Sequence, residues 1–182
     1  MMESLVGAHP SSMLIHGPSK LLVHHYHWHH PNTGIIASYT PNALDVKDHF
    51  GIFRGVDQIE AFAQATTGSC AAFLQLVKKN SKPQKKDDDE FIPTFISVGG
   101  VTFHSYLEEG DTFISIGKII FYKFRQMVVD GRIYKCPKGI DLDSHFKDFT
   151  EEKLNNYEVG DGFTLVAELL GITGRAIKKN IK

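Results

Sequence analysis

The chain has 182 residues, 42% of them hydrophobic and 23% charged, which fits one globular domain with a full hydrophobic core. Its formal net charge of -1 gives no overall attraction to nucleic acid or to an anionic membrane surface. Its two cysteines are too few for a disulfide framework, no apolar run approaches membrane-spanning length, and the N-terminal sequence lacks a signal-peptide pattern, so we expect a cytoplasmic protein without a membrane span.

The first predicted elements are two strands joined as a hairpin. Residues 20–28 have the apolar and aromatic residues of a strand, and residues 34–40 (GIIASYT) supply its partner. The Pro31-Asn32-Thr33-Gly34 sequence between them has turn-forming residues.

A run of histidines occupies the end of the first strand: His24, His25, His27, His29 and His30. Side chains alternate along a strand, so His25, His27 and His29 would share one face. Imidazoles on one face could bind a transition metal ion. No cysteine or acid lies close by in the sequence to complete such a site. We therefore expect no metal and interpret the run as part of a surface or a subunit contact.

Residues 49–77 (HFGIFRGVDQIEAFAQATTGSCAAFLQLV) begin with a His-Phe-Gly turn and continue as a long helix rich in small residues. A helix that is apolar or small on nearly every side is usually buried, and this one is thin enough for a sheet to wrap closely around it. Near its start, Glu60 lies among apolar residues. Burying a carboxylate is costly unless it is paired or protonated, so Glu60 is the first candidate functional residue.

Residues 78–90 (KKNSKPQKKDDDE) form a charge run, which predicts a solvated loop. Three strands should follow, over residues 94–106, with a bulge or close backbone approach at Gly99-Gly100, over 112–129, and from 132 onward after a hairpin turn at Asp130-Gly131. Two strands, a helix and three antiparallel strands make an α+β pattern. A single sheet curled round the helix satisfies this pattern better than a β-sandwich.

Residues 137–182 are predicted to be an extension that packs on the same domain. We expect a short helix near Glu151 and a longer helix over residues 163–181, whose basic end suits a helix C-terminus. The apolar side of this longer helix would hold Leu165, Val166, Leu169, Leu170, Ile172 and Ile177. It would pack across the sheet or a dimer, act as a lid, or contact a carrier protein.

Two motifs carry a family resemblance. Near the central helix the chain reads His49-Phe50, then Gly55-Val56, then Ile59-Glu60-Ala61 with Ala63-Gln64, and upstream it reads His16-Gly17-Pro18 followed by Leu21-Leu22-Val23. In this order they resemble motifs of the 3-hydroxyacyl-[acyl carrier protein] dehydratases, over roughly residues 14–136. The resemblance implies the hotdog fold for residues 1–136: an antiparallel sheet wrapped around a long central helix, here with a C-terminal helical extension.

Removing water from a 3-hydroxyacyl thioester needs a base at the carbon beside the carbonyl, an acid at the departing hydroxyl and stabilisation of the thioester oxygen. The resemblance implies His49 as the base, since a histidine titrates near neutrality, and Glu60 as the acid, if an apolar pocket keeps it protonated. Backbone N–H groups at Gly55 and Val56 would face the oxygen at the helix start. Gln64 would orient the acid.

Two other functions are compatible with the same residues. In an acyl thioesterase, Glu60 would activate water or attack the carbonyl, and Arg54 could favour a carboxylated or phosphate-bearing substrate. A third possibility is an acyl-binding or assembly subunit without activity.

The resemblance implies a homodimer or an oligomer of dimers, with His49 and Glu60 coming from different subunits. The expected partner is an acyl carrier protein or coenzyme A thioester. In one interpretation, the lysines of residues 78–90 of this chain contact the carrier protein. No metal or redox cofactor is required, and phosphopantetheine enters only as part of the substrate.

Overall fold

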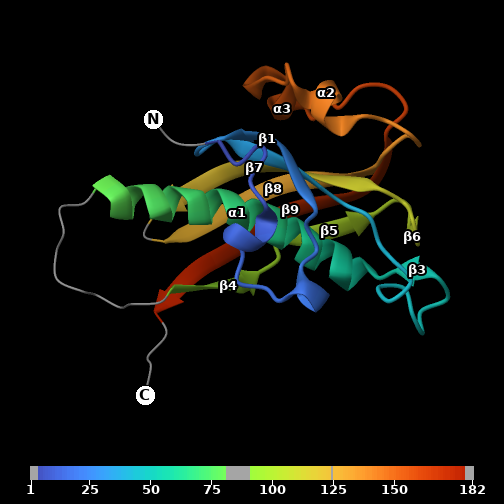
Figure 1. Ribbon diagram of the computed structural model, residues 1–182, viewed down its shortest axis with the longest axis horizontal. Coiled ribbons are helices and arrows are strands. Elements are labelled where there is room, and N and C mark those ends of the chain that lie inside the picture. The colour runs from blue at the N-terminus through green and yellow to red at the C-terminus, as the bar shows by residue number, and fades with distance from the viewer. Residues whose placement is uncertain (1–3, 81–90, 124, 179–182) are drawn as a thin grey trace.

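The computed structural model describes residues 4–80, 91–123 and 125–178, and within them an antiparallel sheet of seven strands lies against one long helix, α1 (Gly55–Asn80). The sheet order is β1-β2-β7-β8-β9-β4, and β5 also pairs with β9 (Figure 1). The sheet strands are β1 (His25–His30), β2 (Gly34–Tyr39), β4 (Phe91–Ser97), β5 (Gly100–Phe103), β7 (Phe113–Lys123), β8 (Gln126–Lys135) and β9 (Thr164–Lys178). The remaining elements are two 3-10 helices, Pro10–Ser12 and Pro18–Lys20, the short strand pair β3 (Ile52–Phe53) and β6 (Leu107–Glu108), and the helices α2 (Leu142–Phe146) and α3 (Glu151–Asn156).

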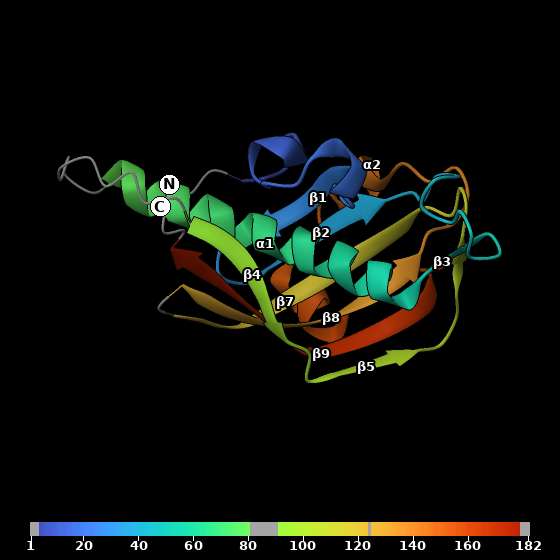
Figure 2. The ribbon, with the colours of Figure 1, turned by 90° about the horizontal axis from the view of Figure 1, so that it is seen from below.

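The elements form three layers. Helix α1 crosses one face of the sheet, where it contacts β2, β7, β8 and β9, while α2 and α3 cover part of the opposite face (Figures 1 and 2). The segment before β1 lies beside α1 and over β1 (Figure 2). The predicted α+β arrangement of a sheet around a central helix is therefore confirmed. None of the described helices is both long and apolar enough to cross a membrane.

A pair of glycines lets α1 approach the sheet closely. Gly117 on β7 and Gly131 on β8 are opposite each other in the strand register, and the fully buried ring of Phe62 lies against them. A Cβ at Gly131 would collide with that ring, and one at Gly117 would stand 2.5 Å from the Thr66 methyl carbon. Because interiors are close-packed, this groove fixes which face of α1 meets the sheet.

The predicted hairpin turn at Asp130-Gly131 is wrong, because both residues lie inside β8. The turn between β7 and β8 falls instead between Lys123 and Gln126 and contains Arg125 with a positive φ of 65°. Asp130 lies at an irregularity in the β8–β9 register, where its Oδ1 accepts a 2.7 Å hydrogen bond from the Gly171 N–H. Gly131 is thus required by the close approach of α1, and not by a turn.

The predicted C-terminal helix over residues 163–181 is also wrong, because residues 164–178 form strand β9 in the middle of the sheet. Two register shifts along the β8–β9 ladder interrupt the alternation of side chains. They leave Val166, Leu169 and Ile172 on the core side, a spacing of three that resembles a helical stripe. The short helix expected near Glu151 is confirmed as α3.

The remaining strand predictions are partly right. The single strand expected over 94–106 is divided into β4 and β5, both paired with β9. The close backbone approach expected at Gly99-Gly100 occurs, since a Cβ at Gly99 would be 2.8 Å from the Leu170 carbonyl oxygen. The predicted 78–90 loop lies outside the described residues from position 81, and α1 continues to Asn80.

The predicted histidine face does not form, because a bulge between Tyr26 and Trp28 interrupts the alternation of β1. His27 therefore lies on the α2 side of the sheet, where its Nδ1 is 2.5 Å from Asp143 Oδ1 and its Nε2 is 2.7 Å from Ser38 Oγ. His29 lies on the α1 side. Burial lowers the pKa of His27 despite the opposing effect of Asp143.

His29 joins three segments through a neutral ring. Its Nδ1 accepts a hydrogen bond from the Leu5 N–H at 3.3 Å, so the proton resides on Nε2, which lies 2.8 Å from Ser69 Oγ on α1. Burial, and to a smaller extent the neighbouring His30, lowers the pKa of His29 to about 4. A protonated Nδ1 would lose its acceptor role, so the neutral ring is the form that holds the N-terminal segment.

We predict that acid destabilises the protein through His29. Its pKa is depressed on folding, so its stabilising effect is complete above the unfolded value of 6.5 and is lost as pH falls toward about 4. The free energy of unfolding should fall by up to about 1.4 kcal/mol per pH unit over that interval from this group. Urea denaturation of the wild type and His29→Gln between pH 7.5 and 4 measures the difference. A variant with the wild-type slope would contradict the assignment, and His25→Gln, at an exposed position on the same strand, is the control.

Candidate active site

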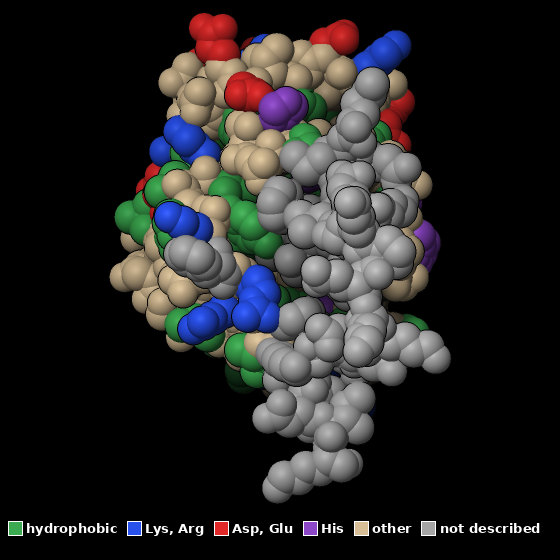
Figure 3. Space-filling view, turned by 90° about the vertical axis from the view of Figure 1, so that its left-hand side faces the viewer, with side chains coloured by type: hydrophobic (Ala, Val, Ile, Leu, Met, Phe, Trp, Pro, Cys, Tyr) green, Lys and Arg blue, Asp and Glu red, His purple; other side chains and the backbone are tan. Residues whose placement is uncertain are grey.

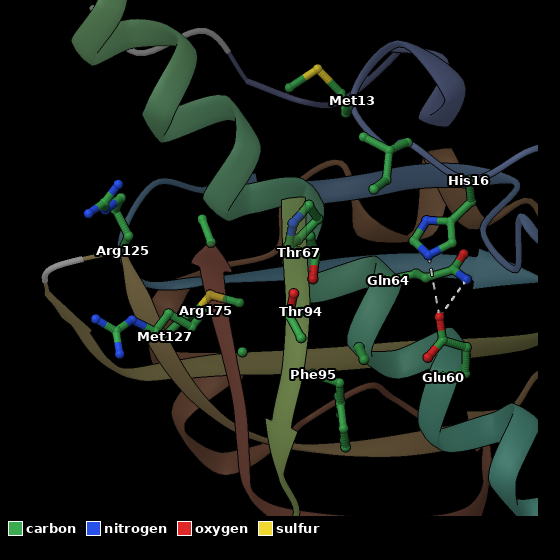
Figure 4. Close-up of a pocket in the computed structure, with 15 residues that line it drawn as sticks. Met13, His16, Glu60, Gln64, Thr67, Thr94, Phe95, Arg125, Met127 and Arg175 are labelled. Atoms are coloured by element: carbon green, nitrogen blue, oxygen red, sulfur yellow. Dashed lines mark hydrogen bonds and ion pairs between the residues drawn. The ribbon is translucent and has the colours of Figure 1, made fainter. Parts of the chain in front are cut away.

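Two cavities meet at the side chains of His16 and Glu60. The narrower has a volume of about 140 Å³ and lies between α1, the N-terminal segment and strands β4, β8 and β9 (Figure 4). The wider, of about 670 Å³, lies between the N-terminal segment, the loop around Asn42 and the start of α1. A ligand that occupies both cavities must therefore pass the Glu60 carboxylate.

Glu60 lies in the second turn of α1, on the side turned toward the N-terminal segment. Its Oε1 accepts a 2.9 Å hydrogen bond from Gln64 Nε2 and is 3.5 Å from His16 Nε2 (Figure 4). The side chain is 45% exposed, so the enclosed apolar environment expected from the sequence is not formed within one chain. The carboxylate is instead accessible to solvent where the two cavities meet, and its contacts with Gln64 and His16 restrict its position.

Gln64 is a buried amide with three hydrogen bonds. Its Nε2 donates to the Lys20 carbonyl at 2.8 Å and to Glu60, while its Oε1 accepts from the Leu22 N–H at 2.8 Å. Residues four apart lie one above the other on a helix, which is why Gln64 reaches Glu60. Gln64 thus fixes the N-terminal segment to α1 and restricts the position of the carboxylate.

His16 is the site residue whose role sequence reasoning missed. The sequence showed it only as part of the upstream motif, 44 positions before Glu60, and no local pattern indicates that the two meet. Its ring lines both cavities, and its buried Nδ1 has no hydrogen-bond partner among the described residues. An unsatisfied buried nitrogen costs on the order of 1–3 kcal/mol, which a ligand group could recover.

The start of α1 lies at the edge of the wider cavity. Arg54 lines that cavity and holds Asp57 through two hydrogen bonds of 2.6 and 2.9 Å, which raise the pKa of the guanidinium. Gly55 is covered by an aromatic ring, because a Cβ there would be 2.8 Å from Phe103 Cζ. Val56 is 64% exposed. The first N–H groups of a helix have no intrahelical acceptor, so donors are present here.

His49 lies in an exposed loop and lines neither of the two cavities. Asp48, Phe50 and Gly51 around it all have positive φ, and the Phe50 side chain is 99% exposed. Its Nδ1 is 3.2 Å from the Ile52 carbonyl oxygen, so Nδ1 carries the proton and Nε2 keeps a free lone pair. The predicted pair of His49 and Glu60 is therefore not assembled within a single chain.

No family model matches the sequence, and no curated protein is significantly similar to it. The structure is similar to the dehydratase heterocomplex ApeI:P from Xenorhabdus doucetiae, with a TM-score of 0.61 and 11% identity over 93% of this chain and 91% of that one. AziG from S. sahachiroi gives a TM-score of 0.53 and 12% identity over 90% of this chain and 98% of that one. A hypothetical thioesterase with coenzyme A from Streptococcus pneumoniae TIGR4 gives 0.48 and 8% over 84% of each chain. At these identities the likeness concerns the fold, which is a hotdog-like α+β fold.

We predict that Gln64→Leu destabilises the protein by about 2–3 kcal/mol, because the Leu22 N–H and the Lys20 carbonyl lose their partner. Chemical denaturation measures the loss. Hydrogen exchange provides a local readout, since the Leu22 amide should exchange much faster in the variant. Gln126→Leu, a change of the same kind at the start of β8, is the control. Equal stabilities of Gln64→Leu and the wild type would show that the segment is held by other contacts.

Proposed function

We propose that the protein dehydrates a 3-hydroxyacyl thioester, carried by an acyl carrier protein or coenzyme A, to the enoyl thioester in fatty-acid or polyketide-type synthesis. The observation that supports this most strongly is the position of Glu60, held by Gln64 where a narrow and a wide cavity meet. The reacting carbons would lie at this junction. The similarity of the fold to that of a dehydratase heterocomplex agrees with the proposal.

In the proposed reaction the partner's His49 takes a proton from the carbon beside the thioester carbonyl through its free Nε2. Negative charge then develops on the thioester oxygen, which N–H groups at Gly55 and Val56 stabilise. The bond between the β-carbon and its hydroxyl breaks as Glu60 donates a proton, and water leaves. His16 positions Glu60 together with Gln64, since both side chains contact its Oε1.

A second copy of the chain is needed for this scheme, because His49 and Glu60 are not brought together in one copy. Apolar side chains around the start of α1 favour such a contact: Leu44 is 81% exposed, Phe50 99% and Val56 64%. Exposed apolar groups of this size on neighbouring segments are typical of surfaces that bind another protein. Covering them would also exclude water from the Glu60 carboxylate.

A thioesterase is the second candidate, and the 45% exposure of the Glu60 side chain is the observation that favours it. A carboxylate that is open to solvent is suited to activating a water molecule for attack on the thioester carbonyl. The products distinguish the two reactions, since dehydration retains the thioester and hydrolysis releases a thiol.

We predict that the wild type converts a 3-hydroxyacyl thioester to an enoyl thioester, followed by absorbance and mass spectrometry. Glu60→Gln should lower kcat/KM by at least about a hundredfold, because the amide cannot donate the proton that the hydroxyl needs. Glu152→Gln, on α3 at the opposite face of the sheet, should have wild-type activity. Free thiol as the product would support the thioesterase, and unchanged turnover by Glu60→Gln would exclude Glu60 as the acid.

The dimeric site predicts complementation between two inactive variants. His49→Ala and Glu60→Gln chains carrying different tags can be co-expressed and purified as mixed dimers. Each mixed dimer has one complete site, so activity should return to about half that of the wild type. Mixed dimers that stay inactive would exclude a site shared between two subunits, whereas activity of His49→Ala alone would exclude His49 as the base and leave His16 as the imidazole beside Glu60.

A further inference from the structure

The sheet that forms one wall of the narrow cavity has a gap at Gly174 on β9. In the strand register Gly174 lies between Met127 on β8 and Phe95 on β4, and all three residues line the cavity. The next residue of β9 on the same face, Ala176, is also small and lies opposite Pro93. Two consecutive cavity-facing positions of β9 thus carry little or no side chain between larger neighbours, which makes a groove along the strand.

No side chain of the described residues fills this groove at Gly174. Apart from its chain neighbours, the only heavy atom within 4 Å of a Cβ at this position would be the Thr94 carbonyl oxygen, at 3.8 Å. At Gly117 and Gly131, by contrast, a Cβ would collide with side chains of α1. Gly174 does not have a positive φ either, so neither a turn nor close packing requires glycine there. A glycine inside a strand costs stability and often marks a place where a ligand approaches closely.

Helix α1 forms the opposite wall of the cavity with small side chains. Ala63 and Thr67 lie one turn apart on the face that also bears Glu60, and all three line the cavity (Figure 4). The helix rises by about 10 Å from Glu60 to Thr67. An extended chain gains about 1.2 Å per bond, so about eight carbons span this distance.

The remaining lining is largely apolar and includes Met13 and Ile15 of the N-terminal segment. Glu60 is the only acid among the described residues that line the cavity. Arg125 and Arg175 lie at the rim, and their guanidinium groups are directed away from the other labelled residues (Figure 4). Figure 3 looks onto the end of the molecule that contains the β7–β8 turn and shows hydrophobic side chains beside Lys and Arg side chains there. An uncharged alkyl chain suits this lining, because burial of a polar group without a partner is costly.

We propose that the end of an unbranched acyl chain lies in the groove over Gly174 and Ala176, so that Gly174 sets the longest chain that the protein accepts. This inference rests on the proposed function, which places the thioester at Glu60. The groove is one residue wide between Met127 and Phe95, which excludes a branched or cyclic end. The substrate class is a thioester of a linear chain of about eight carbons, which reaches from Glu60 to the groove.

Binding of unreactive analogues of increasing length tests the proposal independently of catalysis. The probes are the butanoyl, hexanoyl and octanoyl amides that correspond to N-acetylcysteamine thioesters, and calorimetry measures their dissociation constants. Each methylene group that the wild type buries should raise the affinity about fourfold. The octanoyl amide should therefore bind about a hundredfold more tightly than the butanoyl amide.

Gly174→Val should fill the groove, leave the affinity for the butanoyl amide unchanged and weaken the octanoyl amide about tenfold, which corresponds to about two methylene groups that are no longer buried. Thr67→Leu fills the cavity from the opposite wall and should have the same effect, so it carries the test if the strand variant does not fold. Gly100→Val is the matched control, since a Cβ at Gly100 on β5 meets open space and the residue does not line the narrow cavity. This control should bind all three amides as the wild type does.

Two results would overturn the proposal. One is a wild-type affinity that does not rise from the butanoyl to the octanoyl amide. The other is binding of the octanoyl amide that a folded Gly174→Val variant, or Thr67→Leu in its place, does not weaken. A protein that shows the expected dependence on chain length but does not dehydrate a 3-hydroxyacyl thioester would refute the proposed reaction and retain the acyl groove. A dehydratase whose binding is insensitive to Gly174→Val would do the reverse.

Discussion

The close approach of α1 to the sheet determines where the candidate site can form. Phe62 lies in the groove made by the two glycines of β7 and β8, so the rotation of the helix about its axis is fixed there. Successive residues are rotated by about 100° along a helix, and positions two before and two after Phe62 therefore point away from the sheet. These positions are Glu60 and Gln64. The packing of a ring against two glycines thus turns the polar pair toward the N-terminal segment.

The N-terminal segment forms the other wall of the site and is held by polar contacts. Gln64 bonds the backbone of Lys20 and Leu22, and His29 bonds the backbone of Leu5 while contacting Ser69. Both are buried side chains whose hydrogen-bonding groups would be costly to leave unpaired, so the segment is positioned more specifically than apolar contact alone would achieve. His16 reaches Glu60 because the chain on its C-terminal side is fixed in this way.

The sequence predicted what depends on short-range patterns and missed what depends on long-range register. The long helix and the helix near Glu151 follow from composition and from spacing on one element, and both are present. The bulges in β1 and along β8–β9 leave no sequence signal, so the histidine face and strand β9 were misinterpreted. Asp130-Gly131 has the composition of a turn, but the glycine serves the approach of α1. The contact of His16 with Glu60 joins residues far apart in the chain, which periodicity cannot reveal.

The unequal cavities on the two sides of Glu60 constrain any ligand that reacts there. The narrow cavity admits a slender chain, and its apolar middle would stabilise alkyl groups by removing them from water. The wide cavity combines apolar side chains such as Leu22 with charged and polar ones such as Lys20 and Arg54, so a hydrated arm finds hydrogen-bonding partners there. A thioester bound in the opposite orientation would place its polar arm against Met13, Phe95 and Met127, where it would lose hydrogen bonds to water. For the proposed thioester substrate, the asymmetry of the two cavities therefore favours one direction of entry, in which the acyl chain passes Glu60 first and the thioester stops beside it.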